Sequence, residues 1–261
     1  MCLETKNVVS SHLYPAALYA YCRNHDNASP VRVGDGVVLH TDRQLQDHLL
    51  CAECEDILNK RGEMWVNPKL ATLQKSFPLY DILMKGPAAH MDEKGGLYFA
   101  AHNPEIDVEK LTHFAMGIFW KASAHSWSGK SRSPMIQLGP YGDGIRTWLR
   151  GESGFPKHVC LTVLVARPEN ALIVLTGPNE RISGRWHSFS LGVPGVVFTL
   201  EVGKQIDSQM RMTCFHENAT HPVLISDEVM GAVWNKVGEH YRESRKTKSY
   251  VAARAKRALK T

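Results

Sequence analysis

Apolar residues recur at intervals of three and four along residues 106–127, the segment IDVEKLTHFAMGIFWKASAHSW. This spacing places them on one face of an α-helix, so the segment is predicted to be a helix that packs against a core. Asp107 and Glu109 fall in its first turn, where acidic side chains suit the helix dipole. The apolar face consists of Leu111, Phe114, Ala115, Ile118, Phe119 and Ala122.

The hydrophobic period changes after residue 158. Five short runs rich in Val, Ile, Phe and Thr follow one another, separated by Pro, Gly and Asn at intervals typical of hairpins. They predict an antiparallel sheet onto which the helix of residues 106–127 packs. The five runs are residues 158–168, 171–177, 185–191, 193–203 and 209–219.

Other segments predict shorter elements. Residues 52–66 indicate a short helix, and residues 68–87 add a further helical turn or two before Gly86 and Pro87 interrupt the pattern. Residues 138–156 are typical of a turn, a short helix and a second turn. Ser226, followed by two acidic residues, predicts the start of a last helix that runs into the C-terminal tail.

Bulk composition describes an ordinary globular chain. Of its 261 residues, 43% are hydrophobic and 22% are charged, which supplies enough apolar material for a core. The first 15 residues lack a basic segment followed by an apolar run, so we expect no signal peptide. The longest apolar runs are too short to cross a bilayer, so we expect a cytoplasmic protein with no membrane partner.

Positive charge is concentrated at the C-terminus. From Arg242 onward the chain carries eight basic residues and a single acid, Glu243, while the preceding part is close to neutral. Such a segment can bind phosphates without reading sequence, with an affinity that falls steeply as salt rises. The alternative is a solvated, frayed helix end. The candidate nucleic-acid contacts are Arg245, Lys246, Lys248, Arg254, Lys256, Arg257 and Lys260.

A pair of cysteines two residues apart, Cys51 and Cys54, opens the segment CAECEDILNK. In a reducing compartment this spacing indicates a metal, because two thiolates at that separation can hold one zinc ion. A tetrahedral site needs four ligands. Cys2 is a further candidate, and Cys22 or His25 of the CRNH segment is the candidate for the fourth.

Two stretches carry a family resemblance. SSHLYPAALYAY followed by HLLCAECEDILNKRGEMWV resembles bacterial and phage proteins of mostly unassigned function that contain Cys-x2-Cys, then SHxxP, then LCxxCE. The resemblance extends over residues 2–160. In outline the order is also similar to the His-Me finger, or HNH, nucleases, in which a structural zinc lies beside a catalytic histidine. Only Cys2 of the first cysteine pair is present, so we expect either a start further upstream or a fourth ligand from elsewhere in the chain.

The resemblance implies roles for two further residues. His12 of SHLYP falls on the histidine that acts as general base. A second residue of the site is expected on the helix after the cysteine pair, where Asn59, Lys60 and Glu55 are the alternatives and Asn59 is the candidate, since asparagine does occur at such sites. Such a nuclease also uses Mg²⁺ or another hard divalent cation. The sequence departs from the pattern at Ser11, where the nucleases often have an acid. Glu63 could be a buried partner or a surface acid at a helix end, and the surface acid is the commoner case.

The predicted fold class is therefore α+β. A treble-clef-like, HNH-like zinc module (residues 1–85) precedes a helix packed on an antiparallel sheet (86–235) and a basic C-terminal helix or tail (236–261). The leading hypothesis is a zinc protein that binds or acts on nucleic acid, as a metal-dependent endonuclease. The alternative is a non-enzymatic binding or scaffold protein in which zinc is purely structural. The sequence makes no prediction of oligomeric state.

Overall fold

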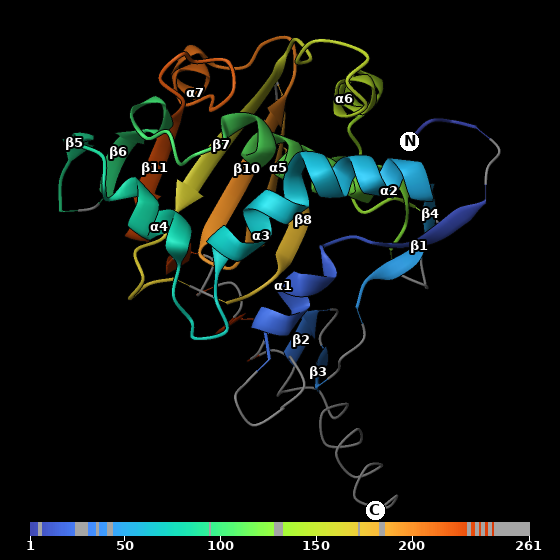
Figure 1. The fold of residues 1–261 in the computed structure, drawn as a ribbon, viewed down its shortest axis with the longest axis horizontal. Coiled ribbons are helices and arrows are strands. Elements are labelled where there is room, and N and C mark those ends of the chain that lie inside the picture. Colours follow the sequence, from blue (N-terminus) through green and yellow to red (C-terminus); the bar gives the residue numbers. More distant parts are fainter. Residues whose placement is uncertain are drawn as a thin grey trace, which may run out of the picture.

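The computed structural model describes most of the chain. The described residues are 1–4, 7–23, 31–34, 37–40, 44–93, 95–127, 133–171, 173–182 and 186–228, with 231, 232, 235, 238, 239 and 242. Within them the fold is α+β, as predicted, and a seven-stranded sheet is its largest element (Figure 1). No helix in these ranges is long and apolar enough to cross a membrane.

The large sheet is mixed rather than antiparallel. Its single parallel pair joins β11 to β7, and every other neighbouring pair is antiparallel. In spatial order the strands are β5 (Ala88–Met91), β6 (Gly95–Phe99), β11 (Pro222–Ser226), β7 (Val159–Val165), β10 (Val196–Val202), β9 (His187–Val193) and β8 (Thr176–Ile182).

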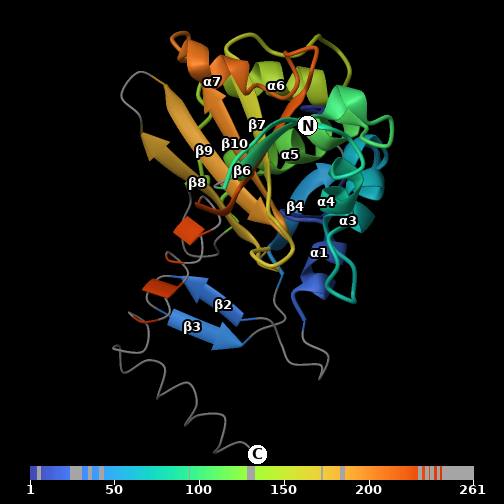
Figure 2. The same cartoon turned by 90° about the vertical axis from the view of Figure 1, so that its left-hand side faces the viewer.

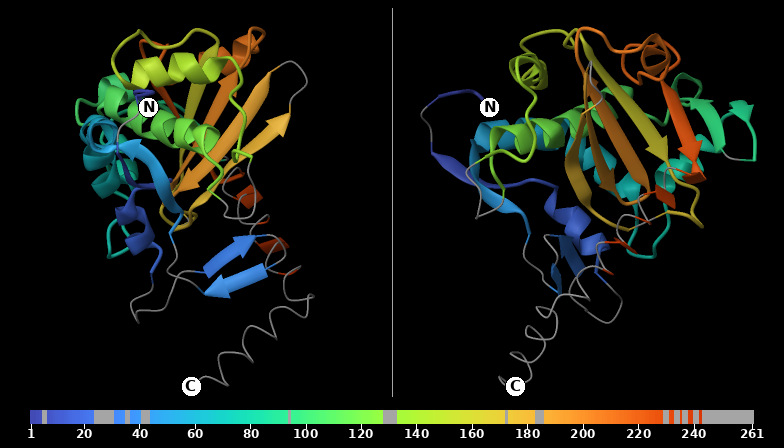
Figure 3. Two further views of the ribbon diagram at one scale, coloured as in Figure 1. Left: turned by 90° about the vertical axis from the view of Figure 1, so that its right-hand side faces the viewer. Right: turned by 180° about the vertical axis from the view of Figure 1, so that it is seen from behind.

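The helix predicted over residues 106–127 is confirmed as α5 (Val108–Ala124). Its N-cap is Asp107, whose side chain accepts a hydrogen bond from the Lys110 backbone N–H. Every residue from Leu111 to Ala122 is buried, because α5 is enclosed on more than its apolar face. The sheet lies on one side of it and the N-terminal helices lie on the other (Figures 1 and 3).

Those N-terminal helices form one nearly continuous rod after a small antiparallel ribbon. β1 (Val8–His12) pairs with β4 (Gln46–Cys51), and the chain passes directly from β4 into the rod. The rod runs without interruption from Ala52 to Leu70. It consists of α2 (Ala52–Leu58), the π-helical turn η1 (Asn59–Glu63) and α3 (Met64–Leu70).

Shorter elements complete the fold. A hairpin of β2 and β3 lies apart from the large sheet (Figure 2). The turn–helix–turn predicted for residues 138–156 is confirmed by α6. These elements are α1 (Ala16–Tyr21), β2 (Val31–Gly34), β3 (Val37–His40), α4 (Pro78–Leu83), the 3₁₀ turn η2 (Ala100–His102), α6 (Tyr141–Leu149) and α7 (Ser208–Met212).

The predicted strands were only partly right. Three of the five runs are strands: β7, β9 and β10. The run 209–219 is instead a short helix followed by turns, and residues 171–177 enter β8 only at their end. Ser226 is the last residue of β11, and the described residues after it (227, 228, 231, 232, 235, 238, 239 and 242) are helical, which agrees with the helix predicted to start there. The basic tail from residue 243 onward lies outside the described residues.

Candidate metal centre and adjoining cleft

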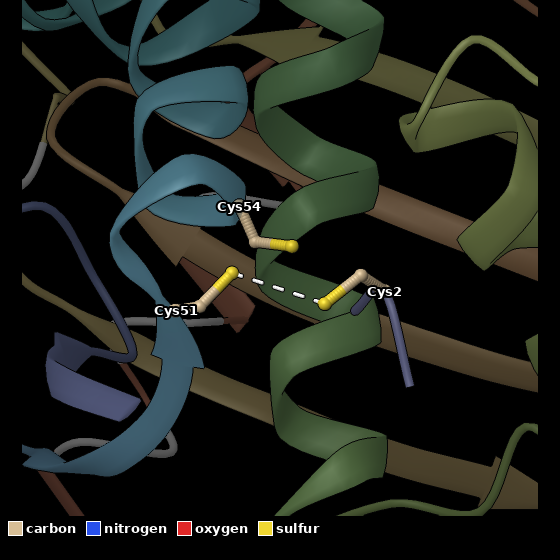
Figure 4. A group of neighbouring side chains, drawn as sticks. All are labelled: Cys2, Cys51 and Cys54. Carbon is tan, nitrogen blue, oxygen red and sulfur yellow. Dashed lines mark hydrogen bonds between the residues drawn. The ribbon is translucent and has the colours of Figure 1, made fainter. Parts of the chain in front are cut away.

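Three cysteines are brought together by the ribbon and the start of the rod. Val8 on β1 pairs with Cys51, the last residue of β4. Cys51 is also the N-cap of α2, and Cys54 follows in its first turn. The N-terminal segment passes beside this corner and supplies Cys2. Figure 4 shows the three sulfur atoms facing one another.

The spacing of the sulfur atoms suits a zinc ion. The Sγ atoms of Cys2 and Cys51 are 3.8 Å apart, and all three Sγ atoms lie within 4.8 Å of one another. Two thiolates each about 2.3 Å from one tetrahedral zinc are separated by roughly 3.8 Å. The three residues therefore form a group that could hold a metal such as zinc, which supports the sequence prediction for Cys2, Cys51 and Cys54.

Burial and neighbouring charge give the thiols distinct properties. Burial raises the pKa of Cys54 to about 11, whereas a hydrogen bond from the Glu4 backbone lowers the pKa of Cys2. A thiol with so high a pKa gives up its proton at neutral pH when a cation coordinates the sulfur. The Arg150 guanidinium lies 3.7 Å from the Cys54 sulfur and offsets part of the negative charge of a thiolate cluster.

The fourth ligand is not among the described residues. Within the described ranges, no other cysteine, histidine, aspartate or glutamate joins the three cysteines. Cys22, one candidate, is instead the C-cap of α1, where burial raises its thiol pKa to about 11. His25, the other candidate, lies outside the described residues.

A polar cleft of about 290 Å³ opens along the same helical rod. His12 enters it from the end of β1 and Asn59 from the rod, so the two residues expected to be catalytic line one cavity although 47 positions separate them. The complete lining is His12, Pro15, Ala16, Ala17, Glu55, Asn59, Glu63, Asn67 and Lys121.

Four of the lining residues follow one another at intervals of four along the rod: Glu55, Asn59, Glu63 and Asn67. In a regular α-helix each four-residue step drifts by about 40° around the axis. The π turn between Asn59 and Glu63 rotates less per residue, so it opposes that drift and keeps the four side chains on one face. The rod thus presents alternating carboxylate and amide groups to the cleft.

Close contact between the rod and α5 brings a lysine into the cleft. A Cβ atom on Gly62 would lie 2.9 Å from the Phe114 backbone nitrogen, so only glycine lets η1 approach α5 this closely. Two turns further along α5, the Lys121 ammonium lies 3.3 Å from a carboxylate oxygen of Glu63. Of the two alternatives for Glu63, the structure therefore favours the buried partner, because its carboxylate pairs with the buried Lys121.

The end of β1 is fixed in place on two sides. A register shift between Val9 and Ser10 interrupts the ladder, and the buried Ser11 hydroxyl accepts the Leu50 N–H at 3.0 Å. Lys121 donates to the His12 carbonyl at 2.8 Å. The serine that stands where the nucleases often have an acid therefore holds the ribbon together.

Two acceptors in the cleft have no hydrogen-bond partner in the described part of the chain. The Glu55 Oε1 and Asn67 Oδ1 atoms are buried, yet no described residue donates a hydrogen bond to them. Leaving such atoms unpaired costs roughly 1–3 kcal/mol each, and more for a charged group. They would be satisfied by a ligand that brings donors into the cleft, such as a hydrated cation.

Sequence reasoning located part of this site. It proposed the three cysteines, His12 and Asn59, but it gave no role to Lys121 and none to Asn67. The only local signal for Lys121 is a charged residue inside an apolar helix. The candidate nucleic-acid contacts lie outside the described residues, namely Arg245, Lys246, Lys248, Arg254, Lys256, Arg257 and Lys260.

Comparisons of this chain with protein-family models, with curated proteins and with solved structures found no match.

Proposed function

We propose that this protein is a zinc-stabilised, metal-dependent phosphodiesterase that cleaves nucleic acid, with His12 as its general base. The observation that carries the proposal is the meeting of His12 and Asn59 in one polar cleft, beside the three-cysteine cluster. The ribbon β1–β4 followed directly by α2 gives this corner a strand–strand–helix order, and that order accords with the HNH resemblance.

Zinc has a structural role in this proposal. Cys2, Cys51 and Cys54 would hold the ion and tie the N-terminal segment to the start of the rod. All three ligands are soft thiolates, and Cys51 and Cys54 are buried. Structural zinc sites are typically closed and thiolate-rich, whereas catalytic sites keep a position for water. The reaction is therefore assigned to the cleft.

In the cleft, His12 would take a proton from the attacking water at a ring nitrogen. Glu55 and Asn59 would hold a hydrated Mg²⁺ or similar cation, since oxygen donors suit hard ions and Mg²⁺ usually keeps several of its waters. When bound, the cation would stabilise negative charge on the phosphate. The unpartnered Glu55 Oε1 supports this assignment, because coordinated waters donate hydrogen bonds.

Nucleic acid is the proposed substrate class because of the basic tail. A surplus of seven positive charges from Arg242 onward would attract a polyanion to a body that is otherwise near neutral. The logarithm of the binding constant should then fall linearly with the logarithm of the salt concentration.

The test is cleavage of end-labelled DNA and RNA oligonucleotides in Mg²⁺ by wild type, His12→Ala and His48→Ala. His48 is a matched control, because it is exposed on the neighbouring strand β4 and does not line the cleft. We expect wild type and His48→Ala to cleave, and His12→Ala to be slower by roughly 10²–10⁴-fold. Chelation of Mg²⁺ should stop cleavage.

The alternative function, a scaffold with purely structural zinc, makes the opposite prediction. No oligonucleotide would then be cleaved, and His12→Ala would change stability alone. Cleavage by His12→Ala at the wild-type rate would also remove His12 from the reaction.

A further inference from the structure

Lys121 is an unusual residue for its position. It is 1% exposed and lies within the fully buried stretch of α5. A charged side chain there is costly unless it is paired, and an apolar residue of similar length could fill the same space. A purely structural account of α5 therefore leaves the lysine unexplained.

The ammonium group of Lys121 has an unused donor. It carries three N–H bonds. Within the described residues two acceptors take two of them, the His12 carbonyl at 2.8 Å and Glu63 Oε1 at 3.3 Å. Both partners line the cleft, as does Lys121 itself. The third N–H is available to a ligand that enters the cavity.

The charges that line the cleft favour the binding of an anion next to Lys121. Glu63 is balanced by Lys121, and a cation held by Glu55 and Asn59 would leave the cavity with a net positive charge. An interior ammonium acts in a low dielectric and is already oriented by two hydrogen bonds, so its attraction for an anion is stronger than that of a solvated lysine.

We propose that Lys121 is the anion-binding residue of the cleft and that its third N–H donates to a phosphate oxygen of the ligand. The inference deepens the proposed function and rests on it for the identity of the anion as a phosphate. Glu63 then has a positioning role: its side-chain oxygen accepts a hydrogen bond from the ammonium and directs it toward the cavity.

Inorganic phosphate is the probe that tests this site, and its binding in the presence of Mg²⁺ can be followed by calorimetry. The variants are Lys121→Met, Glu63→Gln and the double variant, with Lys110→Met as the matched control. Lys110 lies on the same helix and pairs with Asp107 outside the cleft. All variants keep the basic tail, so its contribution to phosphate binding cancels.

We expect wild type and Lys110→Met to bind phosphate alike, and the double variant to bind at least about tenfold more weakly. The double variant removes both charges and leaves no unpaired carboxylate, so weaker binding would not reflect a strained ion pair. Glu63→Gln should bind phosphate more tightly, because the amide oxygen can still accept from Lys121 and direct the ammonium while a negative charge is removed from the cleft. This opposite effect tests the proposal even if Lys121→Met does not fold.

Equal binding by wild type and the double variant, or no binding by wild type, would overturn the assignment of Lys121. The proposed function can fail separately. If phosphate binds through Lys121 but no oligonucleotide is cleaved, the anion site stands and the nuclease does not. If cleavage occurs but phosphate binding does not depend on Lys121, the proposed nuclease function is supported and the anion site is refuted.

Discussion

The cysteine cluster and the cleft share one helical rod but differ in almost every physical property. The cluster is largely buried, and its side chains carry soft sulfur atoms, of which those of Cys51 and Cys54 belong to buried residues. The cleft is polar and open to solvent, and its groups are oxygens, an imidazole and an ammonium. The same few turns of backbone thus serve a site suited to holding an ion permanently and a site suited to exchanging ligands.

The difference between the two sites indicates a division of labour along the rod. A closed thiolate site stabilises the fold but leaves no room for a substrate. The cleft has room, yet its unpartnered acceptors at Glu55 and Asn67 make it a cost to stability in the absence of a ligand. We therefore expect changes at the cluster to act mainly on folding and changes at the cleft to act mainly on binding and catalysis.

The largest effect should come from the cluster. Cys51→Ser should abolish stoichiometric zinc and lower the free energy of unfolding by several kcal/mol. Structural zinc contributes about 10–16 kcal/mol of binding free energy in small zinc-finger peptides, part of which a larger core replaces. Elemental analysis and calorimetric unfolding would measure both quantities side by side.

Cys22→Ser is the matched control for Cys51→Ser, because Cys22 is a partly buried cysteine outside the cluster. It should keep the zinc content of wild type and unfold near the wild-type temperature. A Cys51→Ser protein that retained one zinc per chain would break the distinction between the two sites, since the metal would then be held elsewhere.

The second largest effect should come from His113, a buried histidine of α5. Its Nε2–H donates to the Leu149 carbonyl, and its Nδ1 has no hydrogen-bond partner among the described residues. Burial lowers the pKa of His113 to about 4. Below about pH 6.5, His113 is protonated in the unfolded chain but stays neutral in the folded protein. The free energy of unfolding should therefore fall by roughly 3 kcal/mol between pH 6.5 and 4.

The measurement is the free energy of unfolding by urea across that pH range, for wild type and His113→Gln. Acid would also protonate cysteines that hold a zinc ion and release it, so the informative quantity is the difference in unfolding free energy between the two proteins at each pH. Glutamine keeps a donor for Leu149 but does not titrate. Parallel curves would mean that the pKa of His113 is the same in the folded and the unfolded protein, which would contradict the prediction.

How much the sequence could predict depends on the range of the interactions. Helix α5 and the Cys51–Cys54 pair were predicted because their signals, the apolar spacing and the two-residue interval, lie within one element. Strands β6 and β11 were not, because their pairing joins segments more than a hundred residues apart and β6 opens with two glycines. The short strand β5, which among the described strands pairs only with β6, was not predicted either. The parallel pairing of β11 with β7 likewise has no local signal.

The candidate site divides in the same way. The HNH resemblance pointed to His12 and Asn59, but no pattern within either segment places Lys121 beside them. That contact depends on the packing of the rod against α5 at Gly62, which the structure reveals and the sequence does not. A charged residue inside an otherwise apolar helical face is the one local sign that sequence analysis could have followed to the cleft.

The smallest effect should separate the two sites most cleanly. Gly62→Ala places a methyl group 2.9 Å from the Phe114 backbone nitrogen, so the π turn must move away from α5. Overpacking of this kind costs about 1–3 kcal/mol. The shift would carry Glu63 away from Lys121 and weaken phosphate binding, whereas Cys51 and Cys54, on the preceding turns of the rod, should keep their zinc.

Gly117→Ala supplies the control for Gly62→Ala, because it adds a methyl group at the same helix interface. Its Cβ would meet the flexible end of the Leu58 side chain at 3.3 Å, which can move, and alanine favours the helix by roughly 0.4–1 kcal/mol. We expect Gly117→Ala to resemble wild type in stability, zinc content and phosphate binding. If Gly62→Ala lost zinc as readily as it lost phosphate, the cluster and the cleft would be one cooperative unit, and their division of labour would not hold.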